Sequence, residues 1–175
     1  VILPEKGLVT SGDLVVGADS HTCTYGGLGA FATGVGSTDF AGALLTGKVW
    51  LRVPETVRIV LHGQRRPWVY GKDIILTIIG GHSPDDLLYR ALDFSGPAVA
   101  GLSMADRFTI CNMAVEAGAK NAVFEPDTVT GHYIEGRRRQ LQYIGRLMRD
   151  IDAAPIRERV AVWDGQSRAH AAREH

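Results

Sequence analysis

The sequence predicts an α/β fold in which strands and helices alternate around a mixed sheet. Two observations support this. Short apolar runs bounded by glycine or polar residues recur along the chain, and helix start and stop signals lie between them. The chain has 175 residues, of which 45% are apolar. This is enough for one ordinary domain, or two small ones, with a hydrophobic core.

Charge and hydropathy narrow the classes of function. The formal net charge is zero, so no electrostatic argument favours nucleic acid or an anionic membrane as a partner. No window approaches 18 continuous apolar residues, and the N-terminus shows no signal-peptide pattern. We therefore expect a cytoplasmic protein with no membrane partner.

The first predicted strand is the apolar run 14–16, which we expect to be buried. Asp19, Ser20 and His21 follow it directly, at the C-terminal end of the strand, where ligands bind in open α/β sheets. A glycine-rich stretch separates this cluster from a predicted helix over 37–46. Ser37-Thr38-Asp39 supplies the N-cap signal of that helix and Gly47 its stop.

A break near Pro54 divides the chain into two predicted domains. The elements expected after it are, in order, a half-exposed strand over 57–62, a buried helix over 73–79, a short helix begun by Ser83-Pro84 and running through 92, a strand over 92–94, a helix capped by Ser103 and Asp106 that runs to 117 before Gly118, and a strand over 122–124.

Two pairs of polar side chains could carry chemistry. Asp19 and His21 can converge on one pocket and set each other's protonation, although an Asx-turn with a surface histidine has the same spacing. Asn112 and Glu116 share one helix face at positions i and i+4 within an apolar stretch. A buried carboxylate there would be an acid–base candidate, whereas an exposed one would be an ordinary surface residue.

Three other patterns are weaker evidence for a functional site. The glycines of 27–32 resemble a dinucleotide fingerprint, but the strand at 14–16 ends well before them. Cys23 and Cys111 form neither a disulfide framework nor a metal motif, and we expect two buried, reduced thiols. The arginines at 137–139 are too few for a nucleic-acid patch and indicate a solvated face.

Longer strings resemble the aconitase superfamily. They are residues 12–22 (GDLVVGADSHT), 25–39 (YGGLGAFATGVGSTD), 70–76 (YGKDIIL), 102–104 (LSM) and 109–119 (TICNMAVEAGA). Their order and spacing follow the family from residue 1 to about 135. The form of residues 22–26 (TCTYG) is similar to the large subunit of the 3-isopropylmalate dehydratase and homoaconitase branch. The resemblance implies a partial three-layer α/β/α aconitase-like fold.

The resemblance also implies an activity and a set of site residues. The activity is that of a hydro-lyase of leucine biosynthesis, which reversibly dehydrates and rehydrates a 2-hydroxy di- or tricarboxylate at a 4Fe–4S cluster. Its catalytic residues fall on Asp19, His21 and Glu116, with Glu116 and His21 paired around the departing hydroxyl. Its substrate-binding residues fall on Ser20 and Asn112.

Several parts of the family's site have no counterpart here. The three cluster cysteines are expected outside this chain, so no residue is assigned to metal and we expect the chain alone to bind no cluster. The base that removes the α-proton lies in the family on a small subunit or swivelling domain. The missing initiator methionine and cysteines predict a partial chain, inactive by itself.

The expected organisation is 1–53 as part of a first aconitase-like domain, 54–135 as a second, and 136–175 as a divergent tail. The tail contains an amphipathic helix and should be dispensable for the α/β fold. Two alternatives stay open at this point. One is a homoaconitase or aconitase with the same chemistry, as in lysine biosynthesis. The other is an inactive remnant that acts as a binding module.

Overall fold

The computed structural model describes residues 2–83 and 85–147. Contacts between Cα atoms divide the chain into two units, residues 1–137 and 138–175. The predicted boundaries at 53/54 and 135/136 stay predictions. Within the described residues, no helix is long and apolar enough to cross a membrane. In the predicted tail, α5 is described to its end at Leu147, and everything beyond that lies outside the described residues.

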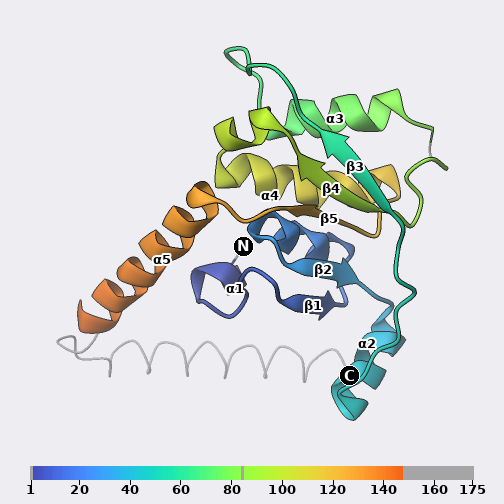
Figure 1. The fold of residues 1–175 in the computed structure, drawn as a ribbon. Coiled ribbons are helices and arrows are strands. Elements are labelled where there is room, and N and C mark those ends of the chain that lie inside the picture. The colour runs from blue at the N-terminus through green and yellow to red at the C-terminus, as the bar shows by residue number, and fades with distance from the viewer. Residues whose placement is uncertain (1, 84, 148–175) are drawn as a thin grey trace, which may run out of the picture. The chain divides into compact units, whose positions relative to one another are not determined.

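The fold is α/β, as predicted, and its elements appear in Figure 1. The strands are β1 (Leu14–Gly17), β2 (Phe31–Gly34), β3 (Thr56–Val60), β4 (Ala91–Ser95) and β5 (Asn121–Phe124). The α-helices are α1 (Ile2–Glu5), α2 (Ser37–Thr46), α3 (Gly71–Gly81), α4 (Met104–Met113) and α5 (Thr128–Leu147). The 3₁₀ helices are η1 (Ser20–Leu28), η2 (Pro97–Gly101) and η3 (Ala114–Ala117).

The strands form two parallel sheets, one of β1 and β2 and one in the order β3-β4-β5. The predicted mixed sheet is therefore wrong for the described residues, where every strand pair is parallel. The physical reason is the connections: α3 and α4 each carry the chain back to the start of the sheet, and such crossovers produce parallel neighbours. Residues 37–46, 92–94 and 122–124 have the predicted type of structure.

The main core lies between the three-stranded sheet and the helices α3 and α4, which lie side by side in Figure 1. Its fully buried side chains include Ile75 of α3, Phe94 of β4, Ile110 of α4 and Phe124 of β5. The rings of Phe94 and Phe124 stack with centroids 4.9 Å apart. Burial of these apolar and aromatic surfaces supplies the main stabilisation of this half of the fold.

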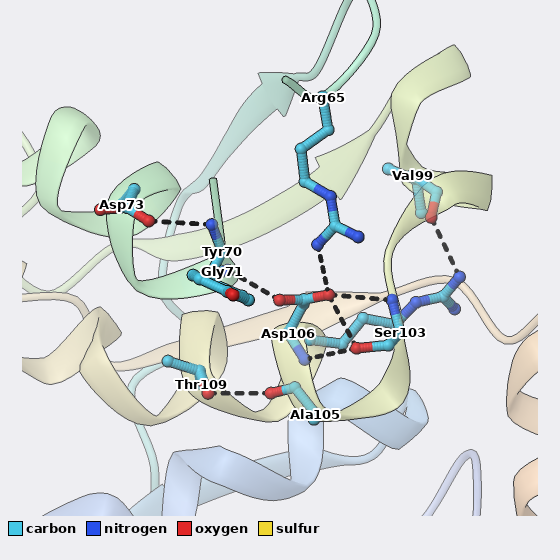
Figure 2. A network of polar contacts seen from close by, with 10 residues as sticks. Arg65, Tyr70, Gly71, Asp73, Val99, Ser103, Ala105, Asp106 and Thr109 are labelled. Carbon is cyan, nitrogen blue, oxygen red and sulfur yellow. Dashed lines mark hydrogen bonds and ion pairs between the residues drawn. The ribbon is translucent and has the colours of Figure 1, made fainter. Parts of the chain in front are cut away.

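The N-terminus of α4 is held by Asp106, as the predicted capping box requires (Figure 2). The main-chain and side-chain groups of Ser103 both donate to the carboxylate, as do Gly71 N and the guanidinium of Arg65. Burial acts to raise the pKa of Asp106, but the hydrogen bonds from Ser103 and Gly71 outweigh it, so the pKa is lowered. One carboxylate thus joins the starts of α3 and α4.

The predicted short helix over 83–92 is wrong. Residues 85–89 form turns and a bend, and Tyr89 adopts a left-handed conformation with φ of 58°. Tyr89 N donates to the carbonyl of Gly118, and Lys120 N donates to the carbonyl of Arg90. These bonds to a distant segment extend the chain towards β4 and override the local helix signal.

Two expected burial patterns also need correction. The strand at 14–16 is present, but Leu14 is 65% exposed and its neighbours in β1 are only half-buried. The helix over 73–79 is present within α3, but only Gly71 and Ile75 are buried and the rest of its apolar side chains are partly or largely exposed. In addition, α2 begins after Gly36 without a side-chain cap.

Close packing of η1 against β5 and α4 requires glycine at positions 26 and 27. A Cβ at Gly26 would overlap the carbonyl oxygen of Ala122 in β5, and one at Gly27 would press on Phe108 of α4. Only a backbone without side chains allows η1 to lie this close to both elements. The local sequence did not predict η1 or β2, because this requirement comes from a tertiary contact.

We expect Gly26→Ala to destabilise the chain by about 1–3 kcal/mol, because the overlapping atom belongs to the main chain and no side-chain rotation relieves it. Gly42→Ala is the matched control, since a Cβ at Gly42 of α2 meets nothing within 4 Å. It should stabilise the chain by about 0.5–1 kcal/mol, as in other helix interiors. Urea denaturation measures both changes. Equal effects at the two positions would contradict the packing argument.

Candidate functional site

The predicted Asp19–His21 cluster lies between β1 and η1. Asp19 is the N-cap of η1, and its carboxylate accepts a hydrogen bond from His21 N over 2.7 Å. The main-chain carbonyl of Asp19 also accepts from the hydroxyl of Thr22. A short polar side chain with extended φ and ψ is what such a cap needs. Asp19, Ser20 and His21 are all exposed at the start of this helix.

The second predicted pair, Asn112 and Glu116, lies at and just after the C-terminal end of α4. Asn112 is in the last turn of α4, and Glu116 lies in η3, the 3₁₀ turn that follows. Gly118 then ends the segment in a left-handed conformation. Asn112 is half-buried and Glu116 is exposed, so the carboxylate is not a buried one as the apolar surroundings had suggested.

The structure brings the two pairs together at the imidazole of His21. Nδ1 of His21 lies 3.1 Å from the main-chain oxygen of Asn112. Nε2 lies 3.9 Å from Oε1 of Glu116, with the two side chains 44% and 57% exposed. The separation is that of an ion pair and is too long for a direct hydrogen bond. An imidazole and a carboxylate so close together are the groups that general acid–base chemistry uses. The catalytic roles assigned to these residues stay predictions.

The side chain of Asn112 turns towards η1 and away from Glu116. Its Nδ2 donates to the hydroxyl of Thr24 over 2.8 Å. The same hydroxyl donates to the main-chain oxygen of His21 over 2.7 Å. Sequence reasoning missed Thr24. In a 3₁₀ helix residues i and i+3 eclipse one another, so the signal was available only if η1 itself had been predicted.

Two cysteines, Cys23 and Cys111, lie next to residues of the site. Cys23 is 1% exposed, and its Sγ lies 3.6 Å from the same Asn112 oxygen that faces His21. Burial, assisted by the charges of Asp19 and Glu116, raises the pKa of the Cys23 thiol to about 11. Burial also raises the pKa of Cys111 well above its usual range. Both thiols are buried and free, in agreement with the prediction of two buried, reduced thiols.

These cysteines do not fit an iron–sulfur cluster. Such clusters are held by several cysteine thiolates, whereas this chain has two cysteines and both of them are buried. Among the described residues, no group of three or more histidine, cysteine or acidic side chains is arranged to hold a metal ion. The described part of the chain thus brings an imidazole and a carboxylate together, and it contains no such group of metal ligands.

A second residue that sequence reasoning missed supports the site from the far side of α4. Arg107 is fully buried, and its guanidinium donates two hydrogen bonds to Asp127, of 2.6 and 2.8 Å. It also donates to the hydroxyl of Thr130 and the main-chain oxygen of Val99. Arg107 therefore ties α4 to η2 and to the start of α5. A single arginine in a helix offers no sequence signal for this role.

Most of the chain matches known proteins. The family model of the aconitase family (aconitate hydratase) matches residues 1–169, which extends beyond the strings quoted above. The chain is similar to three proteins named 3-isopropylmalate dehydratase large subunit. It is 62% identical over 139 residues to that of Syntrophus aciditrophicus, covering 79% of this chain and 33% of that protein.

The other two relatives give a similar result. The identity to the large subunit of Aquifex aeolicus is 59% over 139 residues, covering 79% of this chain and 32% of that protein. The identity to that of Moorella thermoacetica is 52% over 172 residues, covering 92% of this chain and 40% of that protein. The chain thus spans about a third of the length of the curated relatives that it matches.

Proposed function

Because the chain belongs to the aconitase family, we propose that it forms one wall of a hydro-lyase active site of the 3-isopropylmalate dehydratase type. The observation that carries the proposal is the approach of His21 to Glu116 and Asn112, which lie about ninety residues further along the chain. The name of these relatives, 3-isopropylmalate dehydratase, indicates the substrate class, a hydroxylated dicarboxylate. Of the alternatives, homoaconitase or aconitase chemistry would use the same residues on a different substrate.

In the proposed reaction a hydroxyl group leaves the substrate as water while a double bond forms. The chain's part is to move the proton that the departing hydroxyl needs. His21 Nε2 and Glu116 Oε1, which lie 3.9 Å apart, would both face the departing hydroxyl, and either group could donate the proton to it. Asp19 fixes the main chain of His21, and exposed Ser20 next to it would orient the substrate.

The proposal includes two components from outside this chain. A 4Fe–4S cluster, when bound in the full-length enzyme, supplies Lewis-acid chemistry, and its cysteines would come from elsewhere. A small subunit or swivelling domain would carry the base that removes the α-proton, as the relatives' designation as large subunits suggests. We propose neither nucleic acid nor membrane as a partner, and a cytoplasmic location stays a prediction.

A chimera tests the proposed function. Residues 1–139 of this chain would replace the matching segment of the Syntrophus aciditrophicus large subunit, and the product would be reconstituted anaerobically with its small subunit. Dehydration of 3-isopropylmalate is followed by the ultraviolet absorbance of the conjugated alkene. We expect activity with this substrate and less with homocitrate or citrate. A folded chimera that holds the cluster but dehydrates none of the three would disprove the proposal and favour a binding module.

We expect the 175-residue chain by itself to bind no 4Fe–4S cluster. The reason is that such clusters need several thiolates, whereas this chain has two cysteines, both buried. After anaerobic reconstitution and gel filtration, the protein fraction should contain no stoichiometric iron or sulfide. The full-length relative, treated in parallel, is the positive control. A brown protein with retained iron would contradict the expectation.

A further inference from the structure

The contact between His21 and Asn112 determines which ring nitrogen carries the proton. Nδ1 of His21 lies 3.1 Å from a main-chain carbonyl oxygen, and a carbonyl oxygen can only accept a hydrogen bond. Nδ1 must therefore donate. In a neutral imidazole only one nitrogen is protonated, so Nε2 is left with a lone pair. Nε2 is the nitrogen that faces Glu116.

The residue that holds this geometry in place is Thr24. Its hydroxyl has a single proton, which it donates to the oxygen of His21, so it must accept at the other side. There it receives the amide N–H of Asn112. Together with the bond from His21 Nδ1 to the oxygen of Asn112, this closes a ring of three hydrogen bonds through residues 21, 24 and 112.

The direction of each bond in the ring is fixed by chemistry. Both main-chain oxygens accept, and the amide of Asn112 must present its nitrogen to Thr24, since the proton of that hydroxyl is already used. Cys23 shares the carbonyl of Asn112, but its thiol is a weak donor at 3.6 Å. The ring thus holds the last turn of α4 at a set distance from the start of η1.

We propose that Thr24 is a positioning residue of the site, which holds His21 in the tautomer with its proton on Nδ1 and so leaves the lone pair of Nε2 on the side that faces Glu116. The inference rests on the proposed function for its purpose, since Nε2 with a free lone pair can take up the proton that a departing hydroxyl then needs. The tautomer itself is a property of this chain and can be measured without substrate.

Nuclear magnetic resonance of the chain labelled with ¹⁵N-histidine tests the proposal. At a pH where the rings are neutral, the two-bond ¹H–¹⁵N pattern distinguishes the tautomers, and His21→Gln assigns the signal. We expect Nδ1–H at His21 in the wild type and in Thr24→Ser, which keeps the hydroxyl. In the isosteric Thr24→Val the ratio should shift about fivefold towards Nε2–H, the factor expected for loss of one ordinary hydrogen bond.

His82 is an internal control in every spectrum. Its Nδ1 lies 2.8 Å from the main-chain oxygen of Ile78, so it should show the same tautomer and stay unchanged in Thr24→Val. If circular dichroism shows that Thr24→Val is unfolded, Asn112→Asp replaces it. This isosteric side chain cannot donate to Thr24, and the same shift is expected.

Two outcomes would overturn the proposal: Nε2–H at His21 in the wild type, or an unchanged ratio in a folded Thr24→Val or Asn112→Asp. Failure here is distinguishable from failure of the proposed function. An inactive chimera leaves the tautomer of the isolated chain as it is, and an unexpected tautomer leaves the dehydration assay unaffected.

Discussion

Replacement of Glu116 by glutamine is expected to slow alkene formation by the chimeric enzyme about 100-fold or more. The amide has the size of the carboxylate but neither takes up nor releases a proton, so the acid–base group that lies 3.9 Å from His21 Nε2 is lost. Positioned general acid–base groups contribute about 10²–10⁴-fold to a rate. The loss should fall on kcat and leave KM nearly unchanged, because the proton moves only in the transition state.

Glu125→Gln is the control for this experiment. Glu125 is exposed just after β5 and is not one of the candidate site residues. Its replacement changes the net charge by the same amount, yet the rate should stay within a factor of two or so of the parent, as for most surface substitutions. Retention of full activity by Glu116→Gln would show that the acid–base group of the reaction is a different one.

Replacement of Asp127 by asparagine is expected to cost about 3 kcal/mol of unfolding free energy. The guanidinium of Arg107 is fully buried, and it donates one hydrogen bond to each carboxylate oxygen of Asp127. Removing one partner of a buried ion pair leaves an uncompensated charge, at a cost of about 3–5 kcal/mol. We expect the lower end, because the side chain of Asp127 is 32% exposed and water can reach the contact.

Asp93→Asn is the matched control. Asp93 pairs with Arg58, but the two side chains are 34% and 71% exposed, and exposed pairs contribute about 1 kcal/mol or less. Urea denaturation at neutral pH compares the two variants. Similar losses in both would indicate that burial of Arg107 does not decide the cost.

The same ion pair predicts a dependence of stability on pH. Hydrogen bonds from Arg107, its charge and main-chain donors lower the pKa of Asp127 to about 2. The pKa of an aspartate in an unfolded chain is about 3.9. A lowered pKa stabilises the fold above the unfolded value, so this contribution is present at neutral pH and is lost as pH falls from about 4 to 2. Asp127→Asn should lose less stability than the parent across that interval.

The long strings led sequence reasoning to group these residues as a candidate site, even though the local signals around each residue were ambiguous. The spacing of Asp19 and His21 suited an Asx-turn equally well, and Asp19 does cap a helix. What the strings could not show is burial. The resemblance implied that Glu116 lies near His21, but only the fold shows that its carboxylate is exposed on η3.

The elements that sequence reasoning missed depend on contacts between distant segments. The Ser83-Pro84 signal for a helix was genuine locally, but the hydrogen bonds of residues 89–90 to Gly118 and Lys120 prevailed. In the same way, Gly26 and Gly27 are needed for the approach of η1 to β5 and α4, which no periodicity reveals. Elements with caps of their own, such as the helix begun by Ser103, were predicted correctly.

The contact between His21 and Asn112 joins residues that are 91 apart in the sequence, and this separation determines when the site can exist. Contacts between distant residues close late in folding, after the helices and neighbouring strands that form locally. On a ribosome that adds about 5–20 residues per second, His21 waits roughly 5–20 s before Asn112 has even been synthesised. The pair of His21 and Glu116 therefore cannot form on a nascent chain until synthesis has passed residue 116.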